Sequence, residues 1–229
     1  MANYVKDLYN SYLKDDDNYP GIIKEALGTA LFFFAAETGA ASPLRWGLSY
    51  LMVSEVTNCQ MLSTIALRNF AKEGKYDWSS FQALLKQFVG QAFGAYFGHK
   101  FSAYYSGNAV DQVSVAGDFT WEGFRLDILP QLAMIFTFLF FLNRTAKVSE
   151  HRSLFVAFAV AVAFLVNGSG FFTPNRIFGA GAGLADHDFF ADFWSLFSWI
   201  PKVFDHAWEA YLMTFIAGYV AHFFDEYFF

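Results

Sequence analysis

The 229-residue chain contains little charge: Asp, Glu, Lys and Arg together make up 16% of its residues, against about 25% in typical soluble domains. Its single cysteine, Cys59, excludes an internal disulfide framework and a metal site built from several cysteines. The formal net charge of -6 argues against a basic nucleic-acid-binding protein. We therefore expect no nucleic-acid partner and no cysteine-based metal centre.

Apolar and aromatic residues are abundant instead. Phe accounts for 31 residues and aromatic residues for 21% of the chain, and the mean hydropathy is +0.29. A soluble protein of this length has no interior large enough to bury so much Phe. No Ser-His-Asp arrangement, phosphate-binding loop or redox motif accompanies this composition. We therefore predict an all-α integral membrane protein that is not an enzyme.

The apolar residues gather in separate segments, and a bilayer span needs about 20 of them. Six segments fit this requirement to different degrees, the second and fifth being short: roughly 21–40, 43–58, 80–104, 126–143, 153–168 and 207–229. Residues 1–20 are polar and are predicted to form an N-terminal arm. Residues 21–229 are then one transmembrane domain with two halves, of about 21–104 and 126–229.

Basic residues gather in the connections after the second and fourth segments: Arg68, Lys72 and Lys75 in one, and Arg144, Lys147 and Arg152 in the other. Basic loops stay on the cytoplasm-equivalent side of a membrane. Six spans place these two connections on the same side, together with both termini. The charge rule and the number of spans therefore agree.

Two further apolar pieces, 59–67 and 172–180, are too short to span a bilayer. One follows the second predicted span and the other follows the fifth, so they hold corresponding positions in the two halves. Short helices at membrane depth are tolerated where they are buried in protein or line a cavity. The pattern predicts two re-entrant half-helices arranged as an inverted repeat around a central site.

The amino-acid sequences of six segments, taken in their order along the chain, resemble those of a known family: Lys24–Phe34, Thr57–Leu67, Gln87–Gly98, Ser153–Ala157, Thr173–Gly179 and Trp208–Asp225. Together they resemble the aquaporins and glycerol facilitators, the major intrinsic proteins. The resemblance implies a bundle of six transmembrane helices with two re-entrant half-helices. In that family two Asn-Pro-Ala boxes place an Asn at the start of each half-helix, where the side chain donates a hydrogen bond to passing solute. Gly94 and Gly98, by their spacing, are expected to pack inside the bundle.

Both boxes are altered in this chain. The first reads Gln60, Met61 and Leu62, or Asn58-Cys59-Gln60 if a gap is allowed, and the second reads Thr173, Pro174 and Asn175. Gln60 still offers an amide, but on a longer side chain, and Met61 replaces a residue suited to a helix start. Thr173 is a good helix cap but offers only a hydroxyl.

Arg176 matches the arginine that lines the outer constriction of the family's pore. By the same resemblance its neighbours are Trp46 or Ala40 from the second segment, and Phe164 or Ala161 from the fifth. If Trp46 and Phe164 both face Arg176, the constriction is bulky and apolar. Because a guanidinium keeps its charge, we expect Arg176 to donate hydrogen bonds to backbone carbonyls of its own loop.

Glu25, Asp127 and Gln131 are polar residues within apolar segments, and are predicted to be buried polar support. The resemblance implies that Glu25 holds the backbone of the first box; pore lining is the alternative. His187 lies between Asp186 and Asp188, a pattern that fits a solvated loop better than a metal site. We predict no metal and no cofactor.

Two functions compete. One is a conducting channel for water or small neutral solutes. The other is a degenerate family member with a narrowed or closed pore, which acts as a structural or accessory subunit of a membrane complex. An unrelated six-span transporter is a third, weaker interpretation. We favour the accessory subunit because the altered residues are those on which selectivity depends. The expected partners are the lipid bilayer and either other membrane subunits or further copies of the chain. An organelle membrane, such as the mitochondrial inner membrane, is favoured over the plasma membrane.

Overall fold

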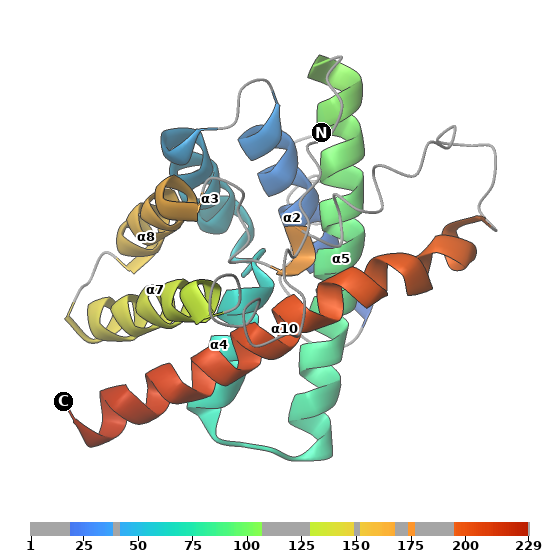
Figure 1. Ribbon diagram of the computed structural model, residues 1–229. Coiled ribbons are helices and arrows are strands. Elements are labelled where there is room, and N and C mark those ends of the chain that lie inside the picture. Colours follow the sequence, from blue (N-terminus) through green and yellow to red (C-terminus); the bar gives the residue numbers. More distant parts are fainter. Residues whose placement is uncertain are drawn as a thin grey trace, which may run out of the picture.

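The computed structural model describes residues 19–38, 42–106, 129–148, 152–167, 174–176 and 195–228. All regular secondary structure within these ranges is α-helical (Figure 1). The all-α prediction is therefore confirmed for the described part of the chain. Nearly all of the predicted polar arm, residues 1–20, lies outside the described residues.

Each of the six predicted segments overlaps one long helix. The helices are α2 (Tyr19–Glu37), α3 (Pro43–Thr57), α4 (Ser63–Glu73), α5 (Trp78–Ser106), α7 (Leu129–Val148), α8 (Arg152–Asn167) and α10 (Ser195–Tyr227), with a separate helical turn at 174–176. The start predicted for the last helix, near 207, was wrong. Helix α10 begins at Ser195. Its first turns carry charged residues such as Lys202 and Asp205, so a search for apolar residues alone did not include them.

Local signals explain several helix ends. At the start of α3 the Ser42 side chain accepts a hydrogen bond from the Arg45 amide at 3.2 Å, and Pro43 occupies the first turn. Helix α4 ends at Gly74, whose φ of 63° favours glycine. The Asp77 carboxylate then accepts a hydrogen bond from the Ser80 amide at 2.8 Å, just before α5 begins. These caps separate α4 from α5 by a short turn.

Helices α2 and α5 approach each other closely along a stripe of glycines on α5. A Cβ atom added at Gly94 would lie 2.4 Å from the Ala26 carbonyl oxygen, and one added at Gly98 would lie 2.7 Å from the Ala30 carbonyl oxygen. Backbones can come this near only where no side chain intervenes. The prediction that Gly94 and Gly98 pack inside the bundle is therefore confirmed.

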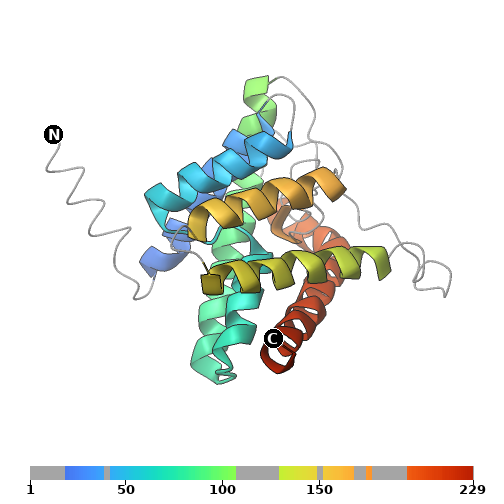
Figure 2. The same ribbon diagram turned by 90° about the vertical axis from the view of Figure 1, so that its left-hand side faces the viewer.

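The helix contacts occur in corresponding pairs. Helix α2 packs against α3 and α5, and α7 packs against α8 and α10, while α3 and α8 pack against each other. Figure 2 shows α3, α8 and α7 lying side by side. Exchanging α2, α3 and α5 for α7, α8 and α10 leaves this list of contacts unchanged.

The interior of the bundle holds polar side chains as well as apolar ones. Fully or nearly fully buried polar residues come from most of the helices: Glu25, Thr29, Ser49, Arg68, Gln91, His99, Asn143 and Thr214. None of the described helices is both long enough and apolar enough to cross a membrane.

The close approach of α2 and α5 predicts a specific loss of stability. Gly94→Ala should lower the free energy of unfolding by about 1–3 kcal/mol, because the new methyl group would press on backbone atoms of α2. Gly218→Ala is the matched control: it lies on α10, and its added Cβ meets only the Leu139 side chain at 3.7 Å. Thermal unfolding of the purified variants measures the difference. Equal stability of the two variants would contradict the tight packing.

Candidate functional site

Helix α4 and the helical turn at 174–176 meet near the centre of the bundle, as both views indicate (Figures 1 and 2). The fully buried Asn175 joins them: its Nδ2 donates to the Met61 carbonyl oxygen at 2.7 Å, and its Oδ1 accepts from the Ser63 amide at 3.4 Å. Helix α4 begins at Ser63 and the other turn at residue 174. The segments therefore meet at their N-terminal ends through one amide side chain.

The backbone before α4 differs from the expected one. Met61 has a φ of 55°, a left-handed conformation that proline cannot adopt because its ring fixes φ near −65°. A helix start near Gln60 was therefore wrong: the left-handed turn at Met61 delays it to Ser63, with Leu62 at the cap position. Met61 and Leu62 are fully buried, whereas Gln60 is half-buried.

Glu25 fastens this turn to α2. Its Oε1 accepts a hydrogen bond from the Gln60 amide at 3.2 Å, and its Oε2 accepts one from Gln91 Nε2 at 3.4 Å. The Cys59 thiol donates to the Lys24 carbonyl oxygen at 3.2 Å. The carboxylate thus contacts loop backbone and a neighbouring helix, and it holds the residues that precede α4 in place.

Trp46, Phe164 and Arg176 come together at one end of α3 and α8. The rings of Trp46 and Phe164 stack with centroids 4.8 Å apart. The Arg176 guanidinium carbon lies 5.3 Å from the Trp46 ring centroid and 6.0 Å from that of Phe164, within the range of cation–π attraction. Ala161, the alternative to Phe164, instead lies beside Gly47 of α3, and Ala40 lies outside the described residues.

Glu37 neutralises the buried arginine. Arg176 Nε donates to Glu37 Oε1 at 2.7 Å, and Nη2 donates to Oε2 at 3.3 Å. Both side chains are largely buried, with exposed fractions of 4% for Arg176 and 11% for Glu37. The expectation that Arg176 bonds to carbonyls of its own loop was wrong, because a two-pronged carboxylate contact compensates a buried charge better than neutral acceptors do.

Glu37 was not singled out in the sequence, although a signal for it exists. It is a second carboxylate at the end of the same apolar helix as Glu25, twelve residues further on, and charged residues in apolar helices are commonly paired. Buried His99 completes this end of the site, with its ring 4.8 Å from that of Phe33 and neither ring nitrogen hydrogen-bonded.

A polar cavity of about 340 Å³ lies at the opposite end of α3 and α8. Its lining comes from α3, the turn before α4, α4, α7 and α8, and includes Ser54, Asn58, Gln60, Arg68, Asn69 and Ser153. Arg68 is held in its wall, since Nε donates to Asn143 Oδ1 at 2.6 Å and Nη1 donates to Asn69 Oδ1 at 3.0 Å. We call this cavity the polar chamber.

The polar chamber and the Trp46–Phe164 stack lie along the same pair of helices, α3 and α8. On α3, Ser54 follows Trp46 by eight residues, and on α8, Val156 precedes Phe164 by eight residues. At a rise of 1.5 Å per residue the two features are about 12 Å apart along the helices. They thus lie near opposite ends of the α3–α8 pair, and we call the line that joins them along these helices the axis.

Some predicted residues cannot be placed. Thr173 and Asp127 lie outside the described residues, as does the His187 region, and Gln131 lies in the first turn of α7 with an undescribed side chain. Within the described part of the chain, His, Cys, Asp and Glu form no group of three that could hold a metal ion.

The sequence was also compared with known proteins. No protein-family model matches it, and a search of curated proteins finds no match.

A double-mutant cycle tests the buried ion pair. Glu37→Gln should lower the free energy of unfolding by about 3–5 kcal/mol, because it leaves the Arg176 charge buried without a carboxylate. Adding Arg176→Gln should recover much of that loss, since both charges are then gone. Chemical unfolding of the two single variants and the double variant measures the coupling. Additive losses would mean that the two residues do not interact.

The left-handed turn makes a second prediction. Met61→Pro, which introduces the family's residue, should destabilise the protein more than Met61→Ala by at least about 1 kcal/mol, because proline cannot reach a φ of 55°. Both substitutions remove the same buried side chain, so the difference between them reports on the backbone. Equal melting temperatures would show that this turn is not left-handed.

Proposed function

We propose that the chain is a multi-pass membrane protein with aquaporin-like architecture whose former pore is closed, and that it serves as a structural or accessory subunit of a membrane complex. The observation that carries the proposal is the Glu37–Arg176 ion pair packed on the stacked rings of Trp46 and Phe164. The arrangement supports a closed pore because the resemblance assigns Arg176, Trp46 and Phe164 to the family's outer constriction.

The outer surfaces of the helices support a membrane setting. Large apolar side chains with exposed fractions above 40% recur every four residues on the outer faces of three helices: Leu27 and Leu31 on α2, Leu44, Leu48, Met52 and Val56 on α3, and Leu212, Ile216 and Val220 on α10. Charged and amide side chains such as Glu25, Gln91 and Arg176 are buried instead. Polar residues inside and apolar residues outside are the distribution expected in lipid.

The contacts between elements support the inverted repeat. The paired packing of α2, α3 and α5 and of α7, α8 and α10 is what two equivalent halves of a transporter or channel produce. The meeting of α4 and the turn at 174–176 through Asn175 adds the central junction. The helix contacts do not depend on the residues of the two boxes, whereas the junction is made by Asn175 of the second box and Met61 of the first.

Part of the hydrogen-bonding capacity at the centre is already used, which supports a closed pore, although Arg176 Nη1 and Gln60 Oε1 have no hydrogen-bond partner among the described residues. The Asn175 amide is hydrogen-bonded to the backbone of Met61 and Ser63, and Arg176 donates two hydrogen bonds to Glu37. Water in single file needs replacement partners at mid-membrane, and each missing partner costs several kcal/mol. The buried side chains of Met61, Leu62 and Phe164 offer none, and narrow apolar constrictions exclude water by dewetting.

The polar chamber favours the second function, a conducting channel for water or small neutral solutes. At one end of the axis its lining is mostly polar and includes Gln60. It does not include Trp46, Phe164 or Arg176, so it supports an entrance more than a complete path. An organelle membrane remains the proposed location, with other membrane subunits or further copies of the chain as partners.

Water permeability separates the two functions. Liposomes that contain the purified protein should shrink in a stopped-flow osmotic assay no faster than protein-free liposomes, because the constriction offers no path past Trp46 and Phe164. Liposomes with a conducting aquaporin at equal protein density are the positive control. Permeability well above the protein-free value that changes in Arg176→Leu would refute the closed pore and favour the channel.

A further inference from the structure

Most of the side chains that line the polar chamber carry hydrogen-bonding groups. Its volume is about 340 Å³, and among its described lining residues only Ile65, Leu142 and Val156 have purely apolar side chains. Asn58 is exposed and Asn69 is half-buried, so a small solute can reach the chamber from outside. A chamber with this lining suits a polar ligand, and its charge decides which kind.

Arg68 sets the charge of the polar chamber. It is the one basic residue among the described lining residues, which include no Asp or Glu. Helix α3 ends at this chamber and α8 begins there, so the partial negative charge of one helix end and the partial positive charge of the other, about half a unit each, offset each other. The full positive charge of the guanidinium therefore makes the chamber attractive to anions.

The hydrogen bonds of Arg68 orient a neighbouring amide toward a ligand. Its Nη1 donates to Asn69 Oδ1 at 3.0 Å, and its Nε donates to Asn143 Oδ1 at 2.6 Å. Because the guanidinium holds the oxygen of Asn69, the Nδ2 group of that amide, with two N–H donors, is the part that can serve a ligand in the chamber. These contacts fix the buried Arg68 before any ligand enters, and such preorganisation lowers the entropic cost of binding.

The donors and the charge together decide the class of ligand. Tyr50 and Ser153 also line the chamber, and each carries a hydroxyl that can donate. A neutral solute would gain hydrogen bonds only, and a cation would be repelled by Arg68 without a carboxylate in the described lining to bind it. An oxyanion gains both the hydrogen bonds and the charge attraction, and charge-assisted hydrogen bonds are roughly twice as strong as neutral ones.

We propose that the polar chamber binds a small oxyanion with a single negative charge, of the short-chain carboxylate class. One guanidinium balances one negative charge, and the volume limits the ligand to about eleven non-hydrogen atoms at roughly 30 Å³ each, the share of one water in liquid. The carboxylate accepts hydrogen bonds from the amide of Asn69 and lies near the Arg68 guanidinium. The inference goes beyond the proposed function, because an anion can occupy this chamber whether the pore is closed or open.

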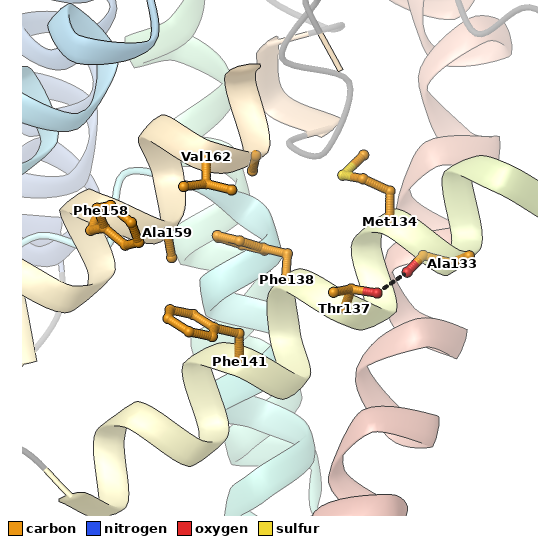
Figure 3. A pocket seen from close by; sticks show the side chains of 9 residues that line it. Ala133, Met134, Thr137, Phe138, Phe141, Phe158, Ala159 and Val162 are labelled. Atoms are coloured by element: carbon orange, nitrogen blue, oxygen red, sulfur yellow. Dashed lines mark hydrogen bonds between the residues drawn. The ribbon is translucent and has the colours of Figure 1, made fainter. Parts of the chain in front are cut away.

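An apolar cavity of similar size provides a control. The groove between α7 and α8 has a volume of about 360 Å³, and Figure 3 shows aromatic and aliphatic side chains lining it, among them Phe138, Phe158 and Val162. Its one hydroxyl, of Thr137, donates to the Ala133 carbonyl oxygen of the same helix at 2.7 Å. No charged residue is among its described lining residues. Filling this groove should therefore leave anion binding unchanged.

An NMR titration of the full chain in mild detergent tests the site, with acetate as the probe and acetamide as its neutral analogue of the same shape. Acetate should shift the side-chain amide signals of Asn58 and Asn69 along a saturable curve. Its affinity should exceed that of acetamide by at least about tenfold, which one charge-assisted hydrogen bond can supply. Arg68→Gln should weaken acetate binding by the same factor or more. Ser153→Leu, which fills the chamber but keeps Arg68, should abolish binding, whereas Ala133→Leu in the apolar groove should bind acetate like the unaltered protein.

Several outcomes would overturn the proposal. Acetamide that binds as tightly as acetate would make the chamber a site for neutral solutes, and acetate shifts that Ser153→Leu leaves unchanged would place the anion elsewhere. Equal affinity for chloride and acetate would remove the preference for an oxyanion. If Arg68→Gln does not fold, the comparison of Ser153→Leu with Ala133→Leu still decides. Water permeability of liposomes tests the proposed function separately, because the closed pore and the anion site can fail independently.

Discussion

A buried guanidinium has to be neutralised where it sits, and this requirement organises the centre of the molecule. Arg176 follows directly on Asn175, so the pair with Glu37 and the amide contacts with Met61 and Ser63 fix the same helical turn from two sides. Glu37 belongs to α2, whereas Met61 and Ser63 belong to the turn before α4 and to its start. The ion pair and the adjacent amide contacts together therefore tie the second half of the chain to two elements of the first half.

Helix α2 holds the turn before α4 and the turn at 174–176 through contacts near its two ends. Near its start, Glu25 holds the backbone of Gln60, and at its end, Glu37 holds Arg176. Between them the helix packs backbone to backbone on Gly94 and Gly98 of α5, which fixes its height and rotation. A shift of α2 would disturb both carboxylates together. The same rigidity keeps the stacked rings of Trp46 and Phe164 in contact with the guanidinium.

The sequence was sufficient for the features that depend on local periodicity. Apolar runs located the long helices, and glycine spacing indicated that Gly94 and Gly98 pack inside the bundle. The family resemblance narrowed the neighbours of Arg176 to Trp46 or Ala40 and to Phe164 or Ala161, but only tertiary packing selects within each pair. The left-handed backbone of Met61 had no signal in the sequence. Glu37 in an apolar helix signalled a charged partner, but Arg176 is 139 residues away and only the folded chain identifies it. Thr173 and Asp127 remain predictions.

Water contact along the axis between α3 and α8 tests the central claim, a closed constriction, most directly. Solid-state NMR of the protein in lipid bilayers can transfer magnetisation from water to individual residues. The account predicts transfer to Ser54 and Asn58 in the polar chamber and none to the side chains of Trp46 and Phe164, which are buried against Arg176. Equal transfer to the chamber and to the Trp46 and Phe164 rings would contradict it, because water would then pass the point that the ion pair and the stacked rings are proposed to close.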